Sequence, residues 1–99
     1  MKAFFSSNDP TGILNKMNSL LSGRELGNLV TLSLKGKQMV VTISKLGTST
    51  LAFTGAEKNG GLEYVLTEEK IAFTHKPFRD EVVKKFIGLI EQAGGKVVG

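Results

Sequence analysis

Few residues of this 99-residue chain have the types and spacing that chemistry needs. His75 is the single histidine, and the absence of cysteine excludes thiol catalysis and cysteine-held metal ions. A serine–histidine–aspartate triad is arithmetically available, yet the sequence has no nucleophile elbow to present a serine. Glu68 and Glu69 are adjacent in a predicted turn, where side chains diverge into water instead of forming an acid–base pair. We therefore predict a protein that is not an enzyme and that holds no metal ion or cofactor.

A basic cluster is the best candidate for a small-anion site. His75, Lys76 and Arg79 straddle Pro77, where we expect a strand to end and a helix to begin. The free N–H groups and the positive dipole end of a helix attract anions, and the three basic side chains would add to this attraction. Two acidic residues follow directly, so the competing interpretation is a neutralised group of surface charges.

The net charge of +4 lies entirely in the first half of the chain. Residues 1–50 carry six Lys/Arg against two Asp/Glu, whereas residues 51–99 carry seven of each. Lys35, Lys37 and Lys45 lie on and near one predicted hairpin and form a candidate polyanion patch. Nucleic-acid binders add aromatic side chains for base stacking, and here the strand aromatics alternate onto the face that we expect to be buried. Nucleic acid is therefore a less favoured partner.

The central part of the chain reads as a meander of antiparallel strands. Short connections permit only antiparallel neighbours, because a parallel crossover needs a dozen or more residues. Gly and Asn supply the positive φ of tight turns, and Asn59-Gly60 is the strongest such signal. The predicted strands are Leu29–Lys35, Gln38–Lys45, Thr50–Thr54, Leu62–Thr67 and Ile71–His75.

These strands alternate with a period of two, which is typical of a sheet with one buried face. The apolar face is predicted to pack against a C-terminal helix through Phe86 and Ile90. Its predicted core residues are Val41, Ile43, Phe53, Leu66 and Phe73.

The opposite face is small, rich in Ser and Thr and nearly uncharged. Plain β-propensity explains such a composition, since strands favour Thr and Val. The other interpretation is a flat surface for a second chain in sheet-on-sheet packing. The residues of this candidate association face are Val40, Thr42, Ala52 and Val65.

Two helices flank the meander. Asp9-Pro10 is a helix start followed by an apolar stripe, and Pro77 opens a second helix with a broad apolar face. We predict one α+β domain over residues 1–99: a five-stranded antiparallel meander with an N-terminal and a C-terminal helix packed on one face. Residues 2–6 and 96–98 are candidates for further strands at the edges.

The leading hypothesis for function is protein association, including self-association, through the outer face of the sheet. One alternative is non-specific binding of nucleic acid or another polyanion. A second alternative is an apolar small ligand between helices and sheet, which requires a cavity there. No stretch approaches the roughly 20 apolar residues of a membrane span, so we expect a cytoplasmic protein with no membrane partner.

Overall fold

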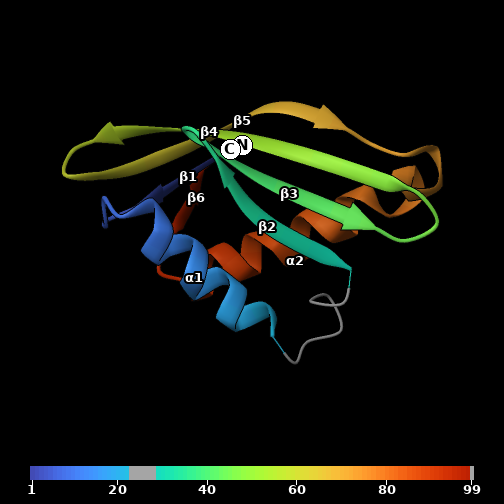
Figure 1. Cartoon of the computed structure of the whole chain (residues 1–99), viewed down its shortest axis with the longest axis horizontal. Helices are drawn as coiled ribbons and strands as arrows, with labels where there is room; N and C mark the ends of the chain where they lie inside the picture. The colour runs from blue at the N-terminus through green and yellow to red at the C-terminus, as the bar shows by residue number, and fades with distance from the viewer. Residues whose placement is uncertain (23–28, 99) are drawn as a thin grey trace.

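The computed structural model describes residues 1–22 and 29–98, and in these residues six antiparallel strands form one open sheet. Two helices lie on the same side of this sheet (Figure 1). The strand order is β2-β3-β4-β5-β1-β6. The predicted α+β class and the placement of both helices on one face are confirmed. The elements are β1 (Lys2–Phe5), α1 (Pro10–Leu21), β2 (Val30–Lys35), β3 (Gln38–Ser44), β4 (Thr48–Lys58), β5 (Gly61–Lys70), the 3₁₀ helix η2 (Phe73–Phe78), α2 (Arg79–Gln92) and β6 (Lys96–Val98).

Strands β2 to β5 form the predicted meander. Asn59 and Gly60 turn β4 into β5 with φ angles of 52° and 78°, as the Asn-Gly signal predicts. Both terminal segments are strands, but β1 is not at an edge. It pairs with β5 on one side and with β6 on the other, so the N-terminus is held inside the sheet.

The prediction of a strand at Ile71–His75 is wrong. A bulge pairs Ala52 with Glu68 and Phe53 with Leu66, and β5 then continues as a paired strand to Lys70. The acidic stretch that the sequence indicates as a turn is therefore part of β5.

The chain leaves the ladder directly after β5. The Ala72 N–H donates a hydrogen bond to the Ser49 hydroxyl at 2.8 Å. In a continuing strand ladder this N–H would donate to a backbone carbonyl instead. Pro77 has no N–H to donate, so it cannot extend a paired strand. Residues Phe73–Phe78 form η2 instead.

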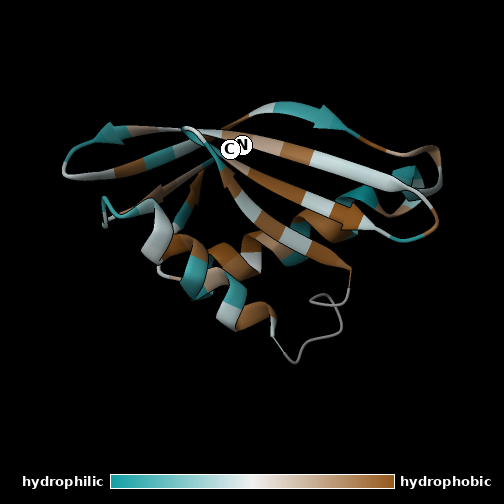
Figure 2. Ribbon diagram, in the orientation of Figure 1, coloured by the Kyte–Doolittle hydropathy of each residue, from teal (hydrophilic) through white to brown (hydrophobic). Residues whose placement is uncertain are grey.

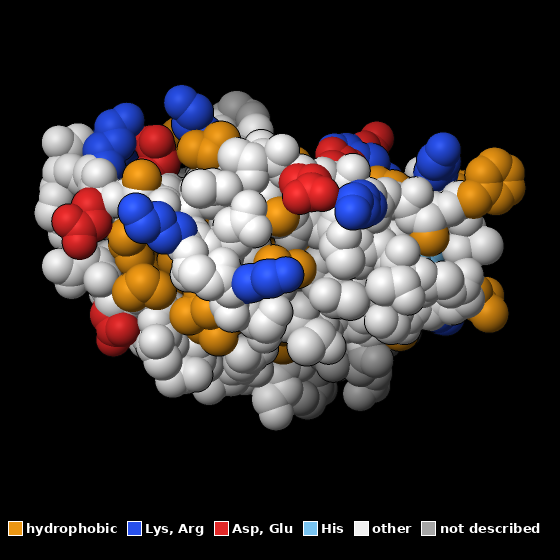
Figure 3. All heavy atoms as spheres, turned by 45° about the horizontal axis from the view of Figure 1, so that its top comes forward, with side chains coloured by type: hydrophobic (Ala, Val, Ile, Leu, Met, Phe, Trp, Pro, Cys, Tyr) orange, Lys and Arg blue, Asp and Glu red, His pale blue; other side chains and the backbone are white. Residues whose placement is uncertain are grey.

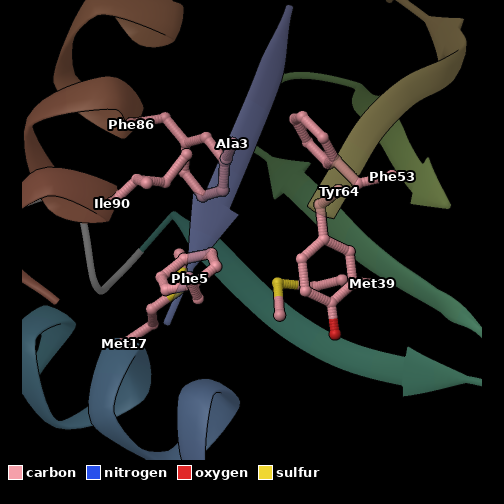
Figure 4. Close-up of a pocket in the computed structure, with 8 residues that line it drawn as sticks. All are labelled: Ala3, Phe5, Met17, Met39, Phe53, Tyr64, Phe86 and Ile90. Atoms are coloured by element: carbon pink, nitrogen blue, oxygen red, sulfur yellow. The ribbon is translucent and has the colours of Figure 1, made fainter. Parts of the chain in front are cut away.

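The core lies between the apolar face of the sheet and the two helices. Apolar and polar residues alternate along the central strands (Figure 2). The rings of Phe53 and Phe86 lie 5.6 Å apart, and Met17 of α1 is fully buried. Side chains from α1, α2 and the sheet point toward one another here (Figure 4) and leave a void of only about 10 Å³. The centre of the molecule is therefore closely packed.

The predicted core is correct in the central strands and wrong after β5. Val41, Ile43 and Phe53 are buried, and Leu66 is half-buried. Phe73, by contrast, is 85% exposed. The physical reason is the change from strand to η2, which ends the alternation that would have turned this ring toward the core.

We predict that Phe53→Ala lowers the free energy of unfolding by about 3–5 kcal/mol, because it removes a large ring from a closely packed core. Phe73→Ala should cost less than about 0.5 kcal/mol, as expected for an exposed side chain. Urea titration of both variants measures the difference. Equal losses would show that Phe73 packs against the core after all.

Candidate functional site

A pocket of about 330 Å³ lies at one end of the molecule, between the sheet and the start of α2. The end of β3 with the turn that follows, the 3₁₀ helix η2 and the first two turns of α2 supply most of its lining. We call it the end pocket. Its apolar walls are formed by Leu29, Ile43, Ile71, Phe78, Val82 and Val83.

The end pocket lies where α2 carries two valines in place of a large aromatic ring. Farther along the helix, Phe86 reaches the sheet and fills the space beneath Phe53. Val82 and Val83 lie one turn earlier and line open space. The contrast with the void of about 10 Å³ at the centre shows that the two regions are packed differently.

A hydrogen-bonded lock fixes the wall of the end pocket. The His75 ring lies between Ser49 and Lys45, with Nδ1 2.5 Å from the Ser49 hydroxyl and Nε2 2.5 Å from the Lys45 carbonyl. A carbonyl only accepts, so Nε2 carries the proton and Nδ1 accepts from Ser49. The Ser49 oxygen in turn accepts the Ala72 N–H. The lock therefore ties η2 to the turn between β3 and β4.

Ser49 and His75 have the residue types of a nucleophile and its base. Ser49 is, however, fully buried, and its hydroxyl both donates and accepts within the lock. A nucleophile must reach a substrate, and this one presents no surface to it. The arrangement is suited to holding structure, because a buried polar group is stable only when its hydrogen bonds are satisfied. Sequence reasoning missed Ser49, since it fell in a predicted turn.

Arg79 forms the second polar connection of this region. Its Nε and one terminal nitrogen bond both carboxylate oxygens of Glu69, the second at 3.0 Å, and its other terminal nitrogen lies 3.1 Å from Asp80. The hydrogen bond from Arg79 lowers the pKa of Glu69 and outweighs the raising effect of its partial burial. The same pairing raises the pKa of Arg79. Glu69 is on the helix side of the sheet because it pairs with buried Leu51.

The three residues of the candidate anion site face different partners. Both ring nitrogens of His75 are used by the lock. Arg79 is held by two carboxylates, and the Lys76 ammonium lies 5.9 Å from the centre of the Phe73 ring. The anion site stays a prediction. The observed contacts are those expected for the competing interpretation, a group of basic side chains neutralised by neighbouring carboxylates. Glu69 is the partner that the sequence did not indicate.

The candidate polyanion patch is divided between the two ends of β3. Lys35 and Lys37 flank the turn before the strand, and Lys45 follows it. A strand of seven residues separates the two groups by roughly 23 Å. All three lysines are exposed.

The candidate association face is continuous across three strands. Val40 pairs with Ala52 across β3 and β4, and Val65 pairs with Thr54 across β4 and β5. Ala52 is only 8% exposed, and Val40, Thr42 and Val65 are half-buried. Basic and acidic side chains are scattered over the side of the molecule that Figure 3 shows.

Lys45 differs from the other charged residues that line the end pocket. Arg79 is paired with Glu69, and Lys85 lies 3.8 Å from Glu81. Within the residues that the structure describes, the Lys45 ammonium has no carboxylate within ion-pair distance. Among the described residues, the pocket therefore combines apolar walls with one lining cation, Lys45, that has no carboxylate partner.

The comparisons with known proteins found no significant similarity to this chain. No family model, no curated protein sequence and no solved structure matches it significantly. Across residues 1–22 and 29–98, no three His, Asp or Glu side chains gather in a way that could hold a metal ion. No helix in the described part of the chain is long and apolar enough to cross a membrane.

We predict that Glu69 titrates below the ordinary glutamate value of 4.5 and that Arg79→Gln raises its pKa toward that value. A lowered pKa in the folded state stabilises the protein above pH 4.5 and stops doing so as the pH falls through the folded value. The stability difference between the two proteins should therefore shrink in acid. Carboxyl NMR titration measures the pKa, and Lys85→Gln is the matched control. An unchanged Glu69 pKa in Arg79→Gln would contradict this.

Proposed function

We propose that the end pocket binds a small, mostly apolar molecule that carries one acidic group. The observation that carries this proposal is a pocket of about 330 Å³ in a protein whose core is otherwise closely packed. Ligand sites are concave, mostly apolar and supplied with a few placed polar groups, and their volumes start at about 300 Å³. This pocket lies at the lower end of that range and suits a ligand of short chain length.

The polar lining supports an apolar ligand with a single charge. The polar atoms of His75 and Ser49 already form the hydrogen bonds of the lock, and the Thr74 hydroxyl donates to the Leu46 carbonyl at 2.6 Å. These groups do not need a ligand to satisfy them. Lys45 is the exception among the described lining residues, and an acidic group placed there gains an ion pair. These observations support the alternative of an apolar small ligand, and the proposal adds to it a preference for an acidic group.

The test is a methyl NMR titration with octanoate and with 1-octanol. The methyl groups of Ile43, Ile71 and Val82 should shift with both ligands, because both alkyl chains bury apolar surface. Octanoate should bind about threefold to fivefold more tightly, since a partly exposed ion pair contributes up to about 1 kcal/mol. Lys45→Gln should remove this preference without removing binding.

Two variants make the titration specific. Val82→Phe adds a ring to the wall of the end pocket and should abolish the shifts with both ligands. Lys35→Gln removes a lysine at the far end of β3 and should leave the octanoate preference unchanged. Shifts spread evenly over all methyl groups would exclude a defined site and overturn the proposal.

A second candidate function is association through the outer face of the sheet. The observation that favours it is the pairing that joins Val40, Ala52 and Val65 into one surface across three strands. Hydroxyl groups on this face also satisfy one another, as in the 2.8 Å bond between Thr54 and Thr67. Such groups lose little when a second sheet covers them.

If this candidate is correct, the protein self-associates as its concentration rises, and Val40→Lys weakens that association by placing a charge in the contact. Light scattering over a concentration series measures the mass. Asn15→Lys on the exposed side of α1 is the control and should behave as the parent protein. A strict monomer at every concentration would remove self-association.

A further inference from the structure

Three large apolar side chains are exposed together at the end of the molecule that holds the end pocket. Leu46, Phe73 and Phe78 are 83%, 85% and 59% exposed, and they are three of the four exposed large hydrophobic residues in the described part of the chain. Hydrophobic side chains project from this end in the space-filling view (Figure 3, right). We call these three residues the apolar tip.

The apolar tip is a fixed arrangement. The Thr74 hydroxyl bonds the Leu46 carbonyl at 2.6 Å, and the His75 ring bonds the carbonyl of Lys45. The turn that carries Leu46 is thus fastened to η2, which carries Phe73 and ends at Phe78. Little side-chain freedom beyond that of the three residues themselves is lost when this surface meets a partner.

Leu46 has a positive φ of 54°, a backbone conformation that Gly or Asn adopts more easily. A branched, apolar side chain there is unfavourable for the backbone and unfavourable in water. Backbone strain of this kind concentrates at binding sites, and the inference runs from the strained residue to a role for it. The side chain that causes the strain is also one of the most exposed in the described chain.

The charges around the apolar tip indicate the charge of the partner that would bind there. Lys45 directly precedes Leu46 in the chain, and the Lys76 ammonium lies 5.9 Å from the centre of the Phe73 ring. Neither ammonium has a carboxylate partner among the described residues. The carboxylates of this region are each engaged: Glu68 by Lys70, Glu69 and Asp80 by Arg79, and Glu81 by Lys85. The positive charge that remains beside the apolar residues complements an anionic surface.

The size and shape of the apolar tip favour a lipid surface over a protein. Three partly exposed side chains offer on the order of 400 Å², about half of what each partner of a stable protein pair buries. They project from the end of the molecule, as side chains that enter the boundary between headgroups and acyl chains do. Stacking on nucleic-acid bases suits them less, because Lys76 lies over the Phe73 ring and Leu46 has no π face.

We propose that the apolar tip docks on the surface of a lipid bilayer that contains anionic headgroups. Leu46, Phe73 and Phe78 enter the interface, and Lys45 and Lys76 contact the headgroups. This is contact with a surface, which needs no membrane-spanning helix, and it departs from the expectation of no membrane partner, which rested on the absence of a spanning stretch. Leu46 and Phe78 also line the end pocket, so docking would bring that pocket close to the acyl chains; that consequence rests on the proposed function.

The test is sedimentation of the whole chain with vesicles of phosphatidylcholine, with and without one third phosphatidylglycerol. We expect binding to the anionic vesicles that weakens as salt rises, because each lysine contributes about fivefold at low salt. Leu46→Asn should weaken binding about tenfold, the effect of removing one leucine from the interface. It should leave the fold intact, since Asn tolerates the positive φ.

Matched controls separate docking from general stickiness and from ligand binding. Val98→Ser removes the fourth exposed hydrophobic residue, on the edge strand β6, and should change vesicle binding less than twofold. Val82→Phe fills the end pocket and should dock as the parent protein does, so docking and ligand binding succeed or fail separately. Lys45→Gln with Lys76→Gln should remove most of the difference between the two vesicle types.

Three results would overturn the proposal. The first is no binding to either vesicle. The second is equal weakening by Leu46→Asn and Val98→Ser. The third is parent-like vesicle binding by Leu46→Asn together with loss of self-association or of single-stranded oligonucleotide binding, which would assign the apolar tip to a second copy of the chain or to a nucleic acid.

Discussion

The length of β4 constrains the rest of this structure. A strand of 11 residues spans roughly 36 Å, whereas the 14-residue α2 spans roughly 21 Å and the 12-residue α1 roughly 18 Å. The helices cannot cover the whole apolar face of so long a strand. They cover its centre, where Phe53 meets Phe86, and leave the sheet to extend beyond them (Figure 1).

The two ends that the helices leave uncovered are composed differently. At the tip of the β4–β5 hairpin the side chains are small or charged, and Lys58 pairs with Glu63 at 3.2 Å. Such an end is stable in water without cover. The other end keeps apolar residues, and only η2 and the first turns of α2 close over them, which leaves the end pocket. The region that a purely structural protein would fill or make polar is here open and apolar.

The Ser49–His75 lock explains how that end stays open. An apolar pocket of this volume would tend to collapse if its walls could move. His75 spans from η2 to the β3–β4 turn, and its two ring nitrogens and the Ser49 oxygen have their partners. Breaking the lock would leave a buried hydroxyl and a backbone N–H unpaired, at a cost of about 1–3 kcal/mol each. The lock thus fixes the distance between the walls without filling the space between them.

Local patterns in the sequence predicted the parts of this fold that depend on local rules. Period-two alternation located the core face, and the Asn59-Gly60 and Asp9-Pro10 signals located a hairpin and a helix start. The strand expected at Ile71–His75 failed because the bulge beside Ala52 moves the end of β5 to Lys70. A bulge depends on two strands together, so neither strand shows it alone.

Local sequence patterns could not predict the candidate site either, because it too depends on several segments together. The volume of the end pocket is set jointly by a turn, a 3₁₀ helix and two small residues of α2, and no single segment indicates it. The ion pair of Glu69 with Arg79 likewise needs the paired register that turns Glu69 toward the helices. The sequence could indicate His75 as unusual, because it is alone, but not that both of its nitrogens are used.

The outer face and the apolar tip differ in what they offer a partner. Binding energy concentrates in a few large side chains that become fully desolvated. The outer face has small residues around Val40 and Thr42, and a partner there would gain area but few anchors. The apolar tip has Phe73 and Phe78 already exposed, on a 3₁₀ helix that the lock ties to the sheet. A partner gains more per residue at the tip, and Leu46 and Phe78 of the tip also line the end pocket, so the proposed surface contact and the proposed ligand site share one location.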